Sequence, residues 1–146
     1  MSPARIDKVI NDAVTHTPIP ENIELTKKVS ASLSEVEVDT DQIRQVLVNM
    51  ITNAVQAMPD VGKLTIEAKE KDSFLEVKIA DTGGGIPKEA IGKIFDPLFT
   101  TRAKGIGLGL AVCKAIIDRH EGHIEVESSV GKGTIFTVKL PLEGGK

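Results

Sequence analysis

The glycines of this 146-residue chain are clustered, and their placement constrains the fold more than any other feature of the sequence. Eight of the 13 glycines fall in three short windows, namely Gly83–Gly85, then Gly105, Gly107 and Gly109, then Gly131 and Gly133. Glycine tolerates positive φ and lets a ligand approach the backbone closely. Glycines gathered beside regular elements therefore indicate a functional role, whereas scattered glycines would indicate only loops.

Composition and charge exclude several classes of protein. The formal charge of −3 provides no basic field for nucleic acid, and 27% charged residues without a long apolar run exclude a membrane span. The single cysteine, Cys113, excludes an internal disulfide framework and suits a reducing cytosol. No charged-then-apolar leader is visible at the N-terminus, so a cytoplasmic location is expected. Whether a longer parent protein is anchored in a membrane stays open.

Apolar residues recur with helical or alternating spacing along the chain, which predicts one domain covering residues 1–146. Helices are expected at 4–14, 42–58, 87–94 and 110–120, with Gly122 ending the last of them. Strands are expected at 22–29 and 34–38, joined by a polar turn, and in two hairpins, 63–71 with 74–81 and 123–129 with 134–142. Residues 95–109 are expected to be irregular. The pattern predicts an α/β (α+β) fold with helices on one face of a largely antiparallel sheet.

The helix expected at 42–58, which Asp39 or Asp41 can cap, carries two asparagines. Asn49 and Asn53 are four residues apart and therefore share one helix face. Asparagine is a mediocre helix former, so the pair costs stability. Either neighbouring backbone groups satisfy both side chains, or the amides are neutral oxygen ligands for Mg²⁺, with nucleotide phosphates completing its coordination.

A predicted strand ends in Asp81 and runs directly into the first glycine window. An ionised carboxylate only accepts hydrogen bonds, so at this place it would select an amino-bearing edge such as the 6-amino group of adenine. An ordinary turn initiated by Asp81 is the alternative, because Asp-x-Gly alone is frequent.

The second glycine window lies in the segment Gly105-Ile106-Gly107-Leu108-Gly109-Leu110, which leads directly into a predicted helix. Backbone N–H groups at a helix N-terminus bind anions, and the helix dipole reinforces them. The preceding donors that can reach phosphates are Thr100, Thr101, Arg102 and Lys104. The spacing matches neither the P-loop nor the dinucleotide fingerprint. A surface loop without a ligand is the alternative.

Two aromatic residues, Phe95 and Phe99, bracket the start of the irregular stretch. They are expected either to anchor a mobile lid or to pack in the core beneath the loop. The choice between these roles stays open at this point.

The histidines are expected to be structural or solvent-exposed. His120 and His123 have a spacing that superficially suggests zinc, but Gly122 lies between them and no fourth ligand is near.

In this order the motifs resemble, over nearly the whole chain, the catalytic ATP-binding domain of sensor histidine kinases, members of the GHKL superfamily. QVLVNMITNAVQAM resembles the N box, ADTGGGIP the G1 box, FDPLF the F box, GIGLGL the G2 box and GKGTIF the closing glycine box. The Gln-Ala-Met ending and the Phe-Thr-Thr-basic sequence are most similar to the nitrogen-regulator type. The resemblance implies a two-layer sandwich of the GHKL or Bergerat type, with a mixed, largely antiparallel sheet.

The resemblance also implies roles for single residues. Asn53 is expected to ligate Mg²⁺, and Asn49 to assist at the metal and the phosphates. Asp81 is expected to read adenine, with Thr134 supporting that contact. The pocket around it is expected to be shaped by Gly83, Gly85 and Ile86.

At the phosphates, the resemblance implies a binding turn and helix start made by Gly105, Gly107, Leu108, Gly109 and Leu110. Thr101, Arg102 and Lys104 precede this turn as lid residues, and Arg102 is expected to join the two asparagines in catalysis. Ile106 stands where the family often has Thr or Ser, so a hydroxyl contact is absent there.

The expected function is protein-histidine kinase activity with Mg·ATP. Hydrolysing relatives carry a glutamate, the general base for water, where this chain has Asn49, and an amide cannot take a proton at neutral pH. Phosphoryl transfer depends mainly on positioning and charge neutralisation, so a histidine nucleophile can be served without that base.

The expected partners are an acceptor histidine on an upstream dimerisation domain, absent from this chain, and a response regulator downstream. No contact with nucleic acid or membrane is expected, and the isolated domain is expected to be a monomer. The alternatives are a nucleotide-binding module without transfer activity, an ATPase, or a serine kinase.

Overall fold

The computed structural model describes residues 2–30, 33–95 and 106–142, with residues 106–109 described by their backbone alone. In chain order the elements are β1 (Ser2–Ala4), α1 (Ile6–His16), β2 (Ile23–Val29), β3 (Val36–Val38), α2 (Thr40–Gln56), β4 (Gly62–Lys71), β5 (Phe74–Asp81), α3 (Lys88–Ile91), α4 (Ile106–Arg119), β6 (His123–Ser129) and β7 (Gly133–Pro141). Within this part of the chain, no helix combines the length and hydropathy needed to cross a membrane.

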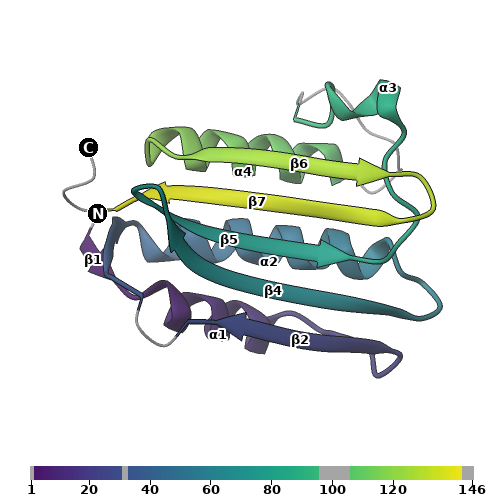
Figure 1. The fold of residues 1–146 in the computed structure, drawn as a ribbon, viewed down its shortest axis with the longest axis horizontal. Coiled ribbons are helices and arrows are strands. Elements are labelled where there is room, and N and C mark those ends of the chain that lie inside the picture. The colour runs from purple at the N-terminus through teal and green to yellow at the C-terminus, as the bar shows by residue number, and fades with distance from the viewer. Residues whose placement is uncertain (1, 31–32, 96–105, 143–146) are drawn as a thin grey trace.

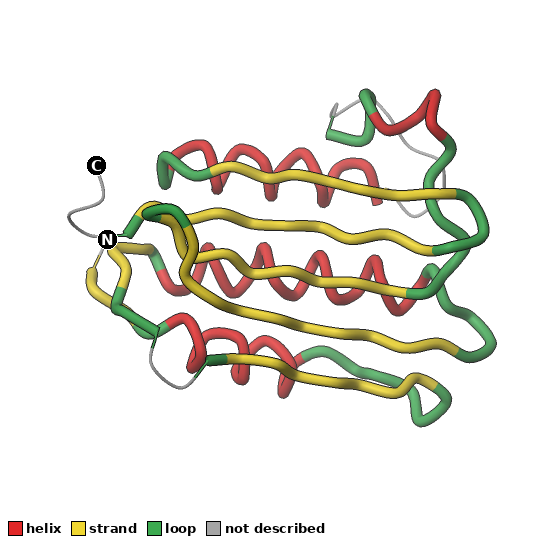
Figure 2. Tube along the Cα trace, in the orientation of Figure 1, coloured by secondary structure: helices red, strands yellow, loops and turns green. Residues whose placement is uncertain are grey.

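A five-stranded sheet in the order β2-β4-β5-β7-β6 forms one layer of the molecule. β2 pairs with β4 in parallel, and every other pairing in this sheet is antiparallel. Helices α1, α2 and α4 lie together behind the sheet, so the domain has two layers (Figure 1, Figure 2). The predicted fold class, a mixed and largely antiparallel sheet with helices on one face, is confirmed.

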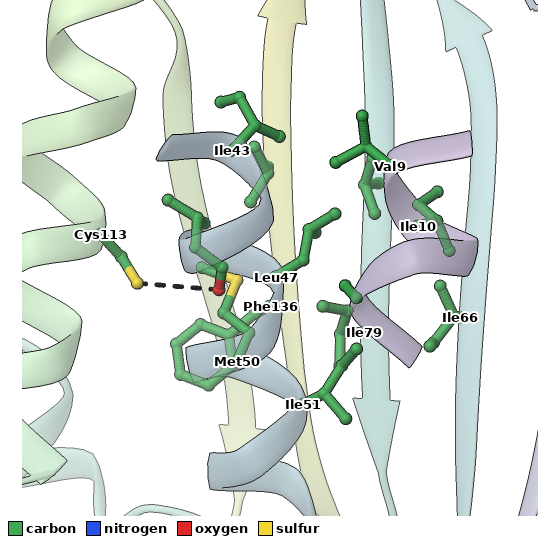
Figure 3. Close-up of a cluster of buried hydrophobic side chains, with 14 of the residues drawn as sticks. Val9, Ile10, Ile43, Leu47, Met50, Ile51, Ile66, Ile79, Cys113 and Phe136 are labelled. Atoms are coloured by element: carbon green, nitrogen blue, oxygen red, sulfur yellow. Dashed lines mark hydrogen bonds between the residues drawn. The ribbon is translucent and has the colours of Figure 1, made fainter. Parts of the chain in front are cut away.

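The core lies between the two layers and is centred on α2. This helix repeats apolar residues with helical spacing, and its side chains Ile43, Leu47, Met50 and Ile51 are all 2% exposed or less. They face β5 from one side, while α1 and α4 flank α2 on either side (Figure 3). Burial of this stripe fixes which face of α2 remains for the two asparagines.

The strands expected at 22–29 and 34–38 are present as Ile23–Val29 and Val36–Val38, and they do not pair with each other. β2 joins the edge of the main sheet beside β4. β3 pairs instead with β1, whose three residues begin the chain's regular structure and were not predicted. Alternation of apolar and polar residues identifies strands but carries no information about which strand lies beside which.

The helix predicted at 42–58 is α2, which begins and ends two residues earlier than predicted. α2 begins at Thr40, and the side chain of Asp39 accepts a hydrogen bond of 3.2 Å from the Gln42 N–H, so Asp39 is the N-cap.

α1 begins two residues later than predicted because Ser2–Ala4 extend as β1. α3 covers only Lys88–Ile91, shorter than the expected 87–94.

α4 ends at Arg119, shortly before Gly122 as predicted, but Gly122 is not the left-handed residue that usually ends such a helix. Glu121 adopts positive φ instead, at 59°. The Gly122 N–H donates to the Ile117 carbonyl at 3.0 Å, and the Glu121 N–H donates to that of Asp118. This is the Schellman arrangement, with a glutamate where glycine is usual. Gly122 is needed for a different reason, since a Cβ there would overlap the carbonyl oxygen of Lys139.

His120 is buried and joins α4 to α2. Its Nδ1 lies 2.8 Å from the Ile116 carbonyl oxygen, and its Nε2 lies 3.0 Å from the Asp39 backbone nitrogen. A carbonyl only accepts and an N–H only donates, so the ring is neutral with its proton on Nδ1. The expected structural role of this histidine is confirmed, because both ring nitrogens are occupied by backbone groups.

His120→Ala should lower the free energy of unfolding by about 2–3 kcal/mol, because it removes both bonds and leaves the part-buried Asp39 N–H without its acceptor. Equilibrium urea unfolding measures the effect. His16→Ala is the matched control, since the His16 side chain is 61% exposed and pairs with Asp12 at the surface. Equal losses from the two variants would contradict the structural role of His120.

Candidate functional site

Asp81 ends β5 as a buried carboxyl group, only 7% exposed. Its Oδ1 accepts a hydrogen bond of 2.8 Å from the Gly83 N–H. Burial raises the pKa of this carboxyl group, while hydrogen bonds from the backbone of Gly83 and Thr134 act in the opposite direction. Ionising Asp81 therefore costs free energy in the folded chain, as is typical of a group retained for a ligand.

The residue opposite Asp81 in the sheet is Thr134, as the register of β5 with β7 shows. The preceding Gly133 has a φ of 112°, and a Cβ on it would overlap the Asp81 carbonyl oxygen. A Cβ on Gly83 would overlap the carbonyl oxygen of Ala57, in the turn after Asn53. The glycines therefore let β7 approach Asp81 closely and let the end of α2 approach the loop that follows Asp81.

The loop after Asp81 is attached to the turn between β6 and β7. The Gly131 N–H donates to the Gly84 carbonyl at 2.9 Å. Gly85 has a φ of 79° and lies so close to Ser129 that a Cβ would overlap its carbonyl oxygen. The Ile86 N–H donates to the Ser128 hydroxyl at 2.7 Å. The structure thus brings Asp81, the predicted glycines, Ile86 and Thr134 together, and adds Ser128, which sequence reasoning missed.

Among the residues that the structure describes, the buried amide nitrogen of Asn53 has no hydrogen-bond partner. A buried amide donor left unpaired costs roughly 1–3 kcal/mol, so the fold itself does not explain this side chain. The alternative of an asparagine satisfied by neighbouring backbone is not supported at Asn53. The amide oxygen of Asn53 is a neutral donor of the kind that Mg²⁺ takes in proteins, whereas the unpaired nitrogen can only donate to an acceptor such as a phosphate oxygen.

Asn49 points instead toward α4, where its Nδ2 donates to the Cys113 sulfur at 3.7 Å. The Cys113 thiol donates in turn to the Val46 carbonyl at 3.8 Å (Figure 3). Burial raises the pKa of this thiol to about 11, so it stays protonated and unreactive at neutral pH. Sequence reasoning did not anticipate that Cys113 orients the Asn49 amide.

α4 starts at Ile106, inside the second glycine window, and not at the predicted residue 110. Gly107, Leu108 and Gly109 are therefore within its first turn, where N–H groups have no intrahelical acceptor. The side chain of Leu110 is buried in the core, so any contact with an anion there would come from backbone. The predicted residues Thr101, Arg102, Lys104 and Gly105 lie outside the described residues.

Phe95 is half-buried and packs edge-on against Phe136 of β7, with ring centroids 6.5 Å apart. Of the two open roles for this residue, the contact supports packing on the core at the start of the stretch. Phe99 lies outside the described residues.

Comparison with known proteins places this arrangement in a family. The family described as "Histidine kinase-, DNA gyrase B-, and HSP90-like ATPase" matches residues 38–144. Sensor histidine kinase ZraS of Klebsiella oxytoca is 38% identical over 143 residues, which cover 92% of this chain and 31% of the relative. Sporulation kinase C of Bacillus subtilis is 40% identical over 105 residues, which cover 72% of this chain and 24% of the relative. The chain thus spans less than a third of these curated relatives.

Solved structures agree in fold over almost the full chain. The nucleotide-free catalytic domain of histidine kinase ThkA superposes with a TM-score of 0.87 at 30% identity, covering 99% of this chain and 98% of that one. Full-length ShkA, solved in complex with AMPPNP, gives a TM-score of 0.83 at 28% identity over 96% of this chain and 30% of that one. With the glycine windows, Asp81 and Asn53 arranged on a fold shared with these domains, the chain belongs to the histidine kinase-, DNA gyrase B- and HSP90-like ATPase family, as a catalytic ATP-binding domain of the sensor histidine kinase type.

Proposed function

We propose that this domain binds Mg·ATP and transfers the γ-phosphoryl group to a histidine on a separate dimerisation domain. The observation that carries the proposal is the buried carboxyl group of Asp81, which the fold holds between two backbone donors despite the cost of desolvation. A domain without a ligand for this group would gain stability by replacing it with a neutral residue.

Adenine recognition is assigned to Asp81 with Thr134 beside it. An ionised carboxylate accepts from the 6-amino group and repels an oxygen at the same ring position. Gly83, Gly85 and Ile86 would form the wall of the adenine pocket on the loop side, and the two glycines pack closely against Ala57 and Ser129 because they carry no Cβ atom.

The phosphate end is assigned to α2 and the start of α4. Asn53 would hold Mg²⁺ through its amide oxygen, and Asn49, oriented by Cys113, would assist at the phosphates. When bound, Mg²⁺ would neutralise charge on the phosphate oxygens. The backbone N–H groups of Gly107, Leu108 and Gly109 would bind phosphate at the N-terminus of α4, together with Gly105 and with Thr101, Arg102 and Lys104 of the lid.

Transfer to a protein group is favoured over hydrolysis because no carboxylate stands at position 49. The Asn49 amide cannot remove a proton from water, and its nitrogen is already engaged with the Cys113 sulfur. The acceptor histidine would then come from the dimerisation domain of the same kinase, and a response regulator would receive the phosphoryl group. ThkA, solved in complex with response regulator protein TrrA, supports this class of partner.

Calorimetric titration with ATP, with and without Mg²⁺, tests the binding step. We expect saturable binding that Mg²⁺ strengthens, and absence of heat at millimolar ATP would refute the nucleotide proposal. Radiolabelled ATP with a cognate acceptor domain then tests transfer. Label on the acceptor histidine separates a kinase from a passive binder, whereas phosphate released at the same rate without acceptor would indicate an ATPase.

A further inference from the structure

Ser128 occupies a position in β6 where the strand pattern calls for an apolar residue. The inward-facing residues of this strand are Ile124, Val126 and Ser128, and the first two pack against the core. Ser128 is half-buried and lies opposite Thr134 in the sheet. A polar side chain at an inward position calls for hydrogen-bond partners.

The Ser128 hydroxyl has three such partners from two segments of the chain. It accepts from the Ile86 N–H at 2.7 Å, donates to the Gly133 carbonyl at 2.9 Å, and lies 2.8 Å from the Thr134 hydroxyl oxygen. A hydroxyl has one proton and two lone pairs. Because the Ser128 proton goes to the Gly133 carbonyl, Thr134 must be the donor in the third contact.

This arrangement fixes the direction of the Thr134 hydroxyl. Its proton is directed to Ser128, so Thr134 can offer only lone pairs to any other neighbour. Thr134 itself is 5% exposed and lies opposite Asp81. Ser128 therefore determines the hydrogen-bonding character of a side chain next to the buried carboxyl group.

Ser128 also holds the far end of the loop that follows Asp81. At the start of this loop the Gly83 N–H donates to the Asp81 carboxyl group. In its middle the Gly84 carbonyl accepts from the Gly131 N–H. The last bond, from the Ile86 N–H, has the Ser128 side chain as its acceptor. Figure 1 shows this segment passing from β5 to α3 beside the turn that joins β6 and β7.

We propose that Ser128 is a positioning residue for adenine selection: it fixes residues 82–86 and the Thr134 hydroxyl beside Asp81. This inference rests on the proposed function, because the selected base is the adenine assigned to Asp81. Ser128 does not itself contact the base. It acts through Ile86 and Thr134.

Ser128→Ala should raise the Kd for ATP about tenfold, since it removes hydrogen bonds on both sides of the pocket. The Kd for inosine triphosphate, which has an oxygen in place of the 6-amino group, should change less than threefold. Discrimination between the two nucleotides should therefore fall by about threefold or more. Calorimetry on both nucleotides measures this ratio, which a general loss of stability would leave unchanged.

Two variants of similar size complete the experiment. Ser129→Ala removes the neighbouring hydroxyl, which is exposed on the other face of β6, and should leave both Kd values within twofold of the wild type. Ser128→Thr keeps the hydroxyl and should restore most of the discrimination. Unchanged ATP binding in Ser128→Ala, or equal losses for ATP and inosine triphosphate, would overturn the proposal.

Amide hydrogen exchange of the nucleotide-free protein separates this inference from the proposed function. The Ile86 amide should exchange at least tenfold faster in Ser128→Ala than in the wild type or in Ser129→Ala. If wild type fails to bind ATP while Ile86 responds in this way, the nucleotide proposal fails and the attachment of the loop stands. If wild type binds ATP and Ile86 does not respond, the positioning role of Ser128 fails alone.

Discussion

Replacing Asp81 with asparagine should weaken ATP binding on the order of 100-fold, since hydrogen bonds to charged groups contribute about 1.5–3 kcal/mol and each 1.4 kcal/mol is tenfold. The carboxylate already accepts from backbone donors of Gly83 and Thr134. The isosteric amide turns one acceptor oxygen into a donor, which must then face either a backbone N–H or the adenine amino group. Calorimetric titration in the presence of Mg²⁺ measures the loss.

Asp72→Asn is the matched control for this variant. Asp72 lies in the turn before β5, at the opposite end of the strand from Asp81, and its φ of 53° suits asparagine. The control removes the same charge and should leave the Kd for ATP within twofold. A change of less than threefold in Asp81→Asn would show that the adenine contact lies elsewhere.

The pH dependence of folding provides a second measure of Asp81. Its pKa is raised in the folded chain, so the native state holds this proton more tightly than the unfolded state. The stabilisation that the native state gains by holding this proton is fully present below the ordinary Asp pKa of 3.8. It is lost as the pH rises through the raised pKa of the folded chain. The stability of Asp81→Asn relative to wild type should therefore increase from pH 3 toward pH 7, and a constant difference in urea unfolding would contradict this.

Asn53→Ala should lower phosphoryl transfer to an acceptor domain on the order of 10²–10³-fold, the range typical of losing one group that stabilises transition-state charge. Binding of ATP in EDTA should change little, and the strengthening of binding by Mg²⁺ should disappear. Transfer of radiolabel from ATP, and titrations with and without the metal, measure these effects.

Stability distinguishes a ligand role of Asn53 from a structural one. Because its amide nitrogen has no partner within the described part of the chain, Asn53→Ala should unfold at nearly the same urea concentration as wild type. Asn11→Ala, an exposed asparagine on α1 that accepts from Lys27, is the control and should not alter transfer. Equal loss of ATP affinity in EDTA and in Mg²⁺ would show that Asn53 shapes the pocket and does not serve the metal.

Sequence periodicity predicted the helices and hairpins well because burial of one face controls them. The stripe of α2 and the alternation of β5 follow directly from contact with the core. The pairing of β1 with β3 could not be predicted, since two three-residue strands carry almost no pattern. The position of β2 beside β4 depends on a parallel pairing between segments separated by α2, which local spacing does not encode.

At the candidate site, the residues adjacent to glycines were predictable and the residues that orient them were not. Asp81 is followed closely by its glycines in sequence, so the chemistry is visible locally. Ser128 and Cys113 act on residues 42 and 64 positions away, through hydrogen bonds to Ile86 and Asn49. The one local signal for Ser128 was its hydroxyl at an inward position of β6. The inward residues before it, Ile124 and Val126, are apolar, and the glycine turn follows it.

The contact between His120 and Asp39 has a mechanical consequence for the helical layer. It joins the last turn of α4 to the residue just before α2, so α4 ends at this common pivot and α2 begins there. Asn53 and the glycines of α4 lie toward the ends remote from that pivot. Helix propensity is also lowest there, because Gly107 and Gly109 weaken the first turn of α4. The two helices are thus joined by a side-chain hydrogen bond at the end remote from the candidate site, and the glycines of α4 lie at the other end.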